Sequence, residues 1–292
     1  MKETITIKSD RLELEVLKPY SELYHRTRFN WNCFVNSILL DGTYQFAEPE
    51  QRDPRRITTY GCGLNSEYKF EETRDMAKIG EEYPRLGNGY LMRTDKEFRF
   101  MVNEPCRPFP TICEANENSV RFVTDMPLCQ GIAGREEKTV SVSGNTVTIH
   151  TKLTNFGEKD IVAEEYNHNF LSLGGEPVTP AYHVEAKHFA NLENCRTMGD
   201  NIYAKDGIVS LRKNPDTSYM IFMDEVKDDA PYSFRLYSDN SALSVTEKDS
   251  FVPVHAVIWG VEHCFCTEVF VGIHIKPMES YEWTRTWTFD KK

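Results

Sequence analysis

Residues 138–153 read Lys-Thr-Val-Ser-Val-Ser-Gly-Asn-Thr-Val-Thr-Ile-His-Thr-Lys-Leu, and this stretch indicates the fold more plainly than any other. Apolar and polar residues alternate on both sides of Gly144-Asn145, which is the pattern of a half-buried strand. A Gly-Asn pair supplies the positive φ angles that a tight hairpin turn requires. We therefore expect an antiparallel hairpin made of Lys138–Ser143 and Thr146–Leu153.

Short strand patterns continue from this hairpin toward both ends of the chain, and amphipathic helices are almost absent. The further expected strands are Thr4–Lys8, Leu12–Leu17, Cys33–Leu40, Phe98–Asn103, Pro110–Glu114, Val120–Asp125, Ile161–Leu173, Ala181–Ala186, Ile208–Arg212, Tyr219–Met223, Tyr232–Tyr237, Leu243–Glu247, Val254–Trp259, Phe265–Ile275 and Tyr281–Phe289. We interpret Lys18–Phe29 as containing a short helical turn, Gly61–Gly89 as a long connection and Asn191–Asp206 as a polar loop. Closely spaced turn signals favour an all-β fold, a large antiparallel β-sandwich, over βαβ units. We expect one domain over residues 1–292.

Composition narrows the classes of partner. The formal net charge of −11 disfavours binding to the phosphate backbone of nucleic acids. The sequence contains no run of 18 apolar residues, so we expect no membrane span. The N-terminus lacks the apolar core of a signal peptide, so we expect a cytoplasmic protein. Its eight cysteines lack paired CxxC spacing and are expected to be reduced. The sequence leaves a homodimer open.

The C-terminal segment Phe265–Ile275 presents two different faces. Phe265 and the alternate residues after it are mostly apolar, whereas Cys266, Glu268, Phe270 and His274 share the other parity. Glu268 therefore stands in mid-strand on a face that is not the plain core. A solvated carboxylate is the alternative interpretation, because Glu is usually exposed.

A second unusual face belongs to the segment Glu164–Leu173. Its residues Glu164, Tyr166, His168 and Phe170 share one parity and mix polar with aromatic groups. Sugars have apolar ring faces and a rim of hydroxyl groups, so an aromatic surface with a few aimed polar groups suits them. A structural histidine bonded within the sheet is the alternative.

Metal and nucleotide motifs give little support to a cofactor. His263-Cys264-Phe265-Cys266 lacks the second ligand pair of a closed zinc site, and no phosphate-binding glycine fingerprint occurs. We expect neither a metal nor a cofactor.

Several motifs, in order, resemble the galactose mutarotase (aldose 1-epimerase) superfamily. Asn167–Leu173 resembles its Asn-His-x-x-Phe-x-Leu segment, and Thr267–Phe270 followed by Ile275–Arg285 resembles its C-terminal Glu strand, turn and last strand. Arg28–Val35, Gly61–Tyr68 and Pro84–Leu91 resemble an uncharacterised branch of the same superfamily.

The resemblance implies a β-sandwich that binds a small carbohydrate on its concave face. It implies His168 as general acid and Glu268 as general base, flanking the sugar ring and interconverting anomers. The chain lacks the upstream His-Gly-Gly segment of galactose mutarotases, so Arg85 or Glu67 is expected to hold hydroxyls instead. Arg28 and His183 are further substrate-binding candidates by position, and Tyr166 and Phe270 are the expected aromatic platform.

Two other functions fit the same residues. A non-catalytic sugar-binding or sensor protein would keep the aromatic platform without using the proton pair. A hydrolase or lyase acting on sugar acids would use Arg28 and Arg85 to clamp a carboxylate in bidentate fashion.

Overall fold

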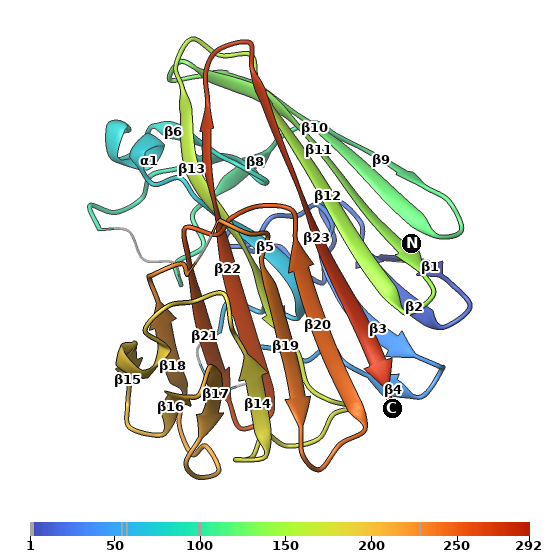
Figure 1. Ribbon diagram of the computed structural model, residues 1–292. Helices are drawn as coiled ribbons and strands as arrows, with labels where there is room; N and C mark the ends of the chain where they lie inside the picture. Colours follow the sequence, from blue (N-terminus) through green and yellow to red (C-terminus); the bar gives the residue numbers. More distant parts are fainter. Residues whose placement is uncertain (1–2, 54, 57, 98–100, 228) are drawn as a thin grey trace.

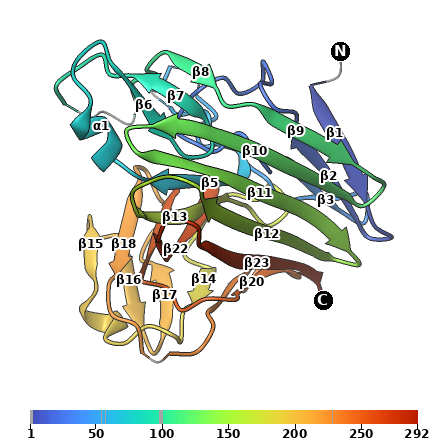
Figure 2. The ribbon, with the colours of Figure 1, turned by 90° about the horizontal axis from the view of Figure 1, so that it is seen from above.

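Two large antiparallel sheets face each other and form a β-sandwich (Figures 1 and 2). The structure is a computed structural model that describes residues 3–53, 55, 56, 58–97, 101–227 and 229–292. The first sheet follows the order β1 (Thr4–Lys8), β2 (Leu12–Leu17), β3 (Val35–Leu40), β5 (Gly63–Lys69), β13 (Ile161–Phe170), β22 (Cys264–Ile275), β21 (His255–Val261), β18 (Tyr219–Met223) and β15 (Arg196–Met198), with β4 (Tyr44–Gln45) beside β3.

The second sheet has ten strands and contains the hairpin expected around Gly144-Asn145. Its order is β16 (Ile202–Lys205), β17 (Ile208–Leu211), β14 (Tyr182–Glu185), β19 (Ser233–Ser238), β20 (Leu243–Asp249), β23 (Ser280–Lys291), β12 (Thr146–Asn155), β11 (Ile132–Ser143), β10 (Ser119–Cys129) and β9 (Thr111–Ala115). A small third sheet is made of β6 (Glu82–Arg85), β7 (Gly89–Met92) and β8 (Cys106–Pro108). Within the described part of the chain, the helical elements are α1 (Glu72–Met76) and the short 3₁₀ turn Leu192–Asn194.

The expected all-β sandwich is confirmed, and so is the hairpin. Strands β11 and β12 pair from Ser143 and Thr146 outward, and Gly144 between them has a φ of +54°. All eight cysteines are free. Among the described residues, no helix is long and apolar enough to cross a membrane.

Four local expectations differ from the structure, and two of them missed short or polar strands, whose alternation signal is weak. The expected connection Gly61–Gly89 contains β5, α1 and β6, and β5 is a central strand. Lys18–Phe29 forms turns and bends without a helix, and Asn191–Asp206 contains all of β15 and β16. Of the expected strand Phe98–Asn103, residues 98–100 lie outside the described residues and 101–103 are not strand.

A polar network between the sheets fixes which way β13 faces. Glu165 accepts a bond of 2.7 Å from Arg285 of β23 and Asn169 donates one of 2.8 Å to Glu247 of β20, so both point toward the second sheet. Neighbouring residues of a strand point to opposite faces. Tyr166 and His168 therefore project from the face turned away from the second sheet, which we call the site face of the first sheet.

Gly63 is where β5 passes closest to β3. It has a φ of +62°, and an added Cβ would lie 2.2 Å from the carbonyl oxygen of Val35. We expect Gly63→Ala to lower the free energy of unfolding by roughly 2–5 kcal/mol, combining left-handed strain with overpacking. Gly207→Ala is the matched control, because Gly207 has a φ of +75° and nothing within 4 Å of the added Cβ. Denaturant unfolding of both variants measures the difference, and equal losses would contradict the role of the close contact.

Candidate active site

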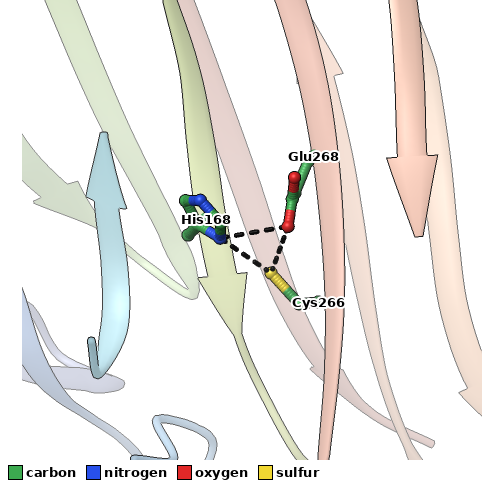
Figure 3. A group of neighbouring side chains, drawn as sticks. All are labelled: His168, Cys266 and Glu268. Carbon is green, nitrogen blue, oxygen red and sulfur yellow. Dashed lines mark hydrogen bonds and ion pairs between the residues drawn. The ribbon is translucent and has the colours of Figure 1, made fainter. Parts of the chain in front are cut away.

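His168 and Glu268 meet across the two central strands β13 and β22. Tyr166 pairs with Phe270 in this antiparallel ladder, so the next residues on the site face are His168 and Glu268. The His168 Nδ1 atom lies 3.0 Å from Glu268 Oε1 (Figure 3). His168 is 4% exposed and Glu268 is 7% exposed. The two groups therefore touch each other and are nearly buried, whereas the sequence analysis expects them on either side of a sugar ring.

Arg28 and Glu67 lie on the other side of the imidazole ring. His168 Nε2 is 3.2 Å from Arg28 Nη2 and 3.6 Å from Glu67 Oε2. The guanidinium favours a neutral ring with a lone pair on Nε2, while the carboxylates favour an imidazolium.

Glu67 organises its neighbours. Its Oε2 atom accepts bonds from Tyr166 Oη at 2.6 Å and Arg28 Nε at 2.8 Å, and its Oε1 atom accepts one from Arg85 at 3.3 Å. Burial raises its pKa, but the charge of Arg28, the nearby His168 ring and the charge of Arg85 outweigh burial and hold the pKa well below its usual range. Glu67 is therefore an ionised carboxylate with both oxygens engaged, and it positions Arg28 and Tyr166.

Arg85 is also engaged by the protein itself. Its Nε atom donates to the Thr27 carbonyl at 3.0 Å, and its Nη2 atom donates to the Arg28 carbonyl at 3.1 Å as well as to Glu67. Both candidate arginines are thus bonded to Glu67. This pairing weighs against a bidentate arginine clamp for the carboxylate of a sugar acid.

Tyr166 and Phe270 stack on each other instead of forming an open platform. Their ring centroids are 4.1 Å apart, and His255 stacks on the far face of Phe270 at the same distance. Lys69 Nζ covers the Phe270 ring at 4.4 Å. Tyr166 is 4% exposed and Phe270 2%, whereas Trp259, which pairs with Cys266 across β21 and β22, is half-buried on the same face.

His183 does not join this group. It lies on β14 of the second sheet, where its Nδ1 atom is 2.7 Å from Ser210 Oγ and its Nε2 atom 3.1 Å from Asp239 Oδ2. Position along the chain alone had suggested it. A role in holding the sugar next to His168 therefore has no geometric support.

Two further residues of the site face are not among the site residues expected from the sequence. Cys266 Sγ lies 3.6 Å from His168 Nδ1 and 3.6 Å from Glu268 Oε1 (Figure 3). Asn65 pairs with His168 across β5 and β13, and its buried Oδ1 atom has no hydrogen-bond partner among the described residues. Strand parity predicts the face of Cys266, but only the pairing of β13 with β22 reveals its contact with His168.

The charge around His168 favours the imidazolium. Burial lowers the pKa of His168, but the charge of Glu268, the bond to Glu268 and the nearby carboxylate of Glu67 outweigh it, so the pKa is raised above its usual value. The charged ring is the form that a general acid needs. The linked stability is complete below the unfolded pKa near 6.5 and is lost as the pH rises through the higher folded pKa.

We expect Glu268→Gln to lower the pKa of His168, because it removes the largest favourable charge. NMR titration of the His168 ring in chelator-treated protein measures this change. Glu164→Gln is the control, since Glu164 shares the site face but forms an ion pair with Lys69 at 3.9 Å. An unchanged pKa in the Glu268 variant would contradict the electrostatic account.

A shallow hollow of about 580 Å³ opens at the β15 end of the first sheet. Among its lining residues are Arg196, Phe222, Asp224 and Glu225. Phe222 pairs with Val257, which pairs with Glu268, so Phe222 shares the site face two strands from the His168–Glu268 pair. At a strand spacing near 4.8 Å, that separation is about 10 Å.

Comparison with solved structures identifies the fold. No protein-family model and no curated protein matches the sequence. A putative aldose 1-epimerase from Escherichia coli K12 is similar at a TM-score of 0.61 and 11% identity, over 99% of each chain. A galactose mutarotase related enzyme from Lactobacillus acidophilus is similar at a TM-score of 0.59 and 13% identity, over 99% of this chain and 97% of the other. The Slr1438 protein from Synechocystis sp. PCC 6803 is similar at a TM-score of 0.61 and 11% identity, over 99% of this chain and 96% of the other. The chain therefore has the galactose-mutarotase-like β-sandwich fold, with a sequence that has diverged widely from these solved structures.

Proposed function

We propose that this protein interconverts the anomers of a small sugar, with His168 as general acid and Glu268 as general base. The observation that carries the proposal is the 3.0 Å contact of His168 Nδ1 with Glu268 Oε1 on the site face. The fold shared with aldose 1-epimerase-like structures supports a sugar as the ligand.

The proposed reaction needs two proton transfers. Glu268 removes the proton of the anomeric hydroxyl while the His168 imidazolium protonates the ring oxygen, and the bond between that oxygen and the anomeric carbon breaks. Rotation of the resulting aldehyde and closure on its other face return both protons. Each positioned group contributes about 10²–10⁴-fold to the rate.

Contact between the acid and the base suits this chemistry. The ring oxygen and the anomeric oxygen are bonded to the same carbon, so neighbouring donor and acceptor groups can reach both. A bound sugar would replace the direct bond between His168 and Glu268 with one bond to each group. The raised pKa of His168 keeps a transferable proton on the ring.

The rest of the site face supplies candidate contacts for the sugar. Half-buried Trp259 offers a flat apolar surface, and the hollow at β15 brings Arg196, Asp224 and Glu225 near Phe222. Ligand sites commonly combine an aromatic lining with a few polar groups in a volume of about 300–1,000 Å³.

Anomer exchange across a panel of sugars tests the proposal. Saturation-transfer NMR on neutral aldoses and uronates is expected to show exchange faster than in buffer alone for at least one neutral sugar. If the protein accelerates anomer exchange for none of these sugars, the proposed reaction is overturned.

A non-catalytic sugar-binding protein is the second candidate, and the burial of the proton pair favours it. With His168 4% exposed and Glu268 7% exposed, a sugar could bind at Trp259 and the hollow without reaching them. Calorimetric binding of a sugar whose anomers exchange no faster than in buffer would select this function.

A further inference from the structure

We infer that His168 Nδ1, Cys266 Sγ and Glu268 Oε1 form a binding site for a thiophilic divalent ion, of which Zn²⁺ is the best fit. The three atoms come from adjacent strands and all belong to buried residues (Figure 3). This inference goes beyond the proposed sugar chemistry and does not depend on it.

The spacing of the three atoms matches a tetrahedral zinc site. Zinc bonds near 2.3 Å to sulfur and 2.0–2.2 Å to nitrogen and oxygen place sulfur about 3.6 Å from each other ligand, and nitrogen about 3.3 Å from oxygen. The observed distances are 3.6 Å from Cys266 Sγ to His168 Nδ1, 3.6 Å from Sγ to Glu268 Oε1, and 3.0 Å from Nδ1 to Oε1. An ion at the centre requires only a slight separation of the imidazole and the carboxylate.

The donor types select the ion. A thiolate with an imidazole and a carboxylate suits zinc, while Mg²⁺ and Ca²⁺ prefer sites made of oxygen alone. Binding displaces the thiol proton of Cys266 and the Nδ1 proton of the His168 imidazolium, and both protons leave to solvent. The thiolate and Glu268 together then carry two negative charges. These charges neutralise a divalent ion, so the buried site gains no net charge.

Glu67 supplies the second shell that such a histidine needs. With the ion on Nδ1, the proton of His168 resides on Nε2, and Glu67 Oε2 lies 3.6 Å from that atom. Histidine ligands almost always direct their other nitrogen at a carboxylate, carbonyl or water. Arg28 Nη2 lies 3.2 Å from His168 Nε2 and would have to turn away from it. The 2.8 Å bond from Arg28 Nε to Glu67 can hold the guanidinium in place during this movement.

Three protein ligands leave one position of a tetrahedral ion to water or a sugar hydroxyl, as in catalytic zinc sites. The ion would occupy the same Nδ1 and Oε1 atoms that proton transfer uses. The two roles therefore exclude each other at any moment.

The ligand set could not be read from local spacing. The local motif His263-Cys264-Phe265-Cys266 does not supply the ligands, because His263 Nε2 is bonded to the Pro49 carbonyl at 2.9 Å. The partners of Cys266 instead come from β13 and from its own strand.

Cobalt titration of the chelator-treated full chain tests the site. Co²⁺ is expected to bind one ion per chain with a thiolate-to-cobalt charge-transfer band in the near ultraviolet, displaced by Zn²⁺ but not by Mg²⁺. Cys266→Ser should abolish the band. Cys264→Ser is the matched control and should retain it, because Cys264 is equally buried on the same strand but lies outside the triad.

Glu268→Gln gives an independent readout if the serine variant fails to fold. It should keep the charge-transfer band and weaken cobalt binding about 10-fold or more, since even outer partners of a metal contribute 10–100-fold. A wild-type chain without the band at excess cobalt, or a band that survives in Cys266→Ser, would overturn the inference. Because no sugar is present, these outcomes are separate from those of the anomer assay.

Discussion

Replacing Glu268 with Gln is expected to lower the enzyme-dependent rate of anomer exchange by about 10²–10⁴-fold, the contribution typical of one general base. Gln has the same volume, and its amide oxygen can accept a bond from His168 Nδ1 as Glu268 Oε1 does at 3.0 Å. The variant thus keeps the packing of the site and removes its basicity. A loss of rate without a loss of stability would locate the effect in proton transfer.

The measurement is saturation-transfer NMR on a sugar that the wild-type protein accepts, with the rate in buffer subtracted and bound metal removed first. Glu164→Gln is the matched control, because Glu164 also lies on the site face of β13 and its carboxylate is directed at Lys69. The control should keep a rate within a few-fold of wild type. Equal rates for Glu268→Gln and wild type would refute the catalytic role of Glu268.

The faces of β13 and β22 could be predicted from the sequence, because alternation is a local property. Parity placed Tyr166 and His168 on one face, and Glu268 and Phe270 on another, and the structure has all four on the site face. The contact between His168 and Glu268 could not be derived from parity. It depends on the register between two strands that are far apart in the chain, and long-range packing sets that register.

Strand β5 shows where the pattern fails. Its residues Asn65, Ser66 and Glu67 are polar, so the segment resembles a loop, yet all three are buried. Each face of the strand meets a partner of matching polarity: Glu67 meets Arg28, and Ser66 meets Lys138. Polar pairs supplied by distant segments therefore replace the apolar alternation by which a strand is usually recognised.

The same argument explains why the expected sugar contacts changed. Tyr166, Phe270, Glu67 and Arg85 are on or beside the site face, but their functional groups are already bonded or stacked within the protein. A sequence reveals the type of a side chain and its face, and it does not reveal a competing partner. Trp259 is an accessible aromatic group on this face, although its sequence pattern is only that of the end of an ordinary strand.

Replacing Arg285 with Met is expected to lower the free energy of unfolding by about 3–5 kcal/mol, because it leaves buried carboxylates between the sheets without their cation. Arg285 is 2% exposed and bonds to Glu165 at 2.7 Å, with Asp249 at 3.7 Å. Denaturant unfolding at neutral pH measures the loss. Arg135→Met is the matched control, since Arg135 also bonds to a carboxylate, Asp125, at 2.7 Å but with both side chains solvated. An exposed pair contributes only about 0–1 kcal/mol.

The pH dependence of the Arg285→Met loss separates charge from packing. Burial already raises the pKa of Asp249 to about 7, even though Arg285 opposes the shift, and burial also raises the pKa of Glu247. Removing Arg285 must raise the pKa of both carboxyl groups further.

A carboxyl group whose pKa is higher in the folded than in the unfolded protein stabilises the fold most when the pH is below its unfolded pKa. That stabilisation is lost as the pH rises through the folded pKa. The difference between wild type and variant should therefore shrink as the pH falls toward 4, where protonated carboxyls need no cation. A cavity left by the shorter side chain would cost the same at every pH, so a constant difference would show that Arg285 acts by filling space and not by balancing charge.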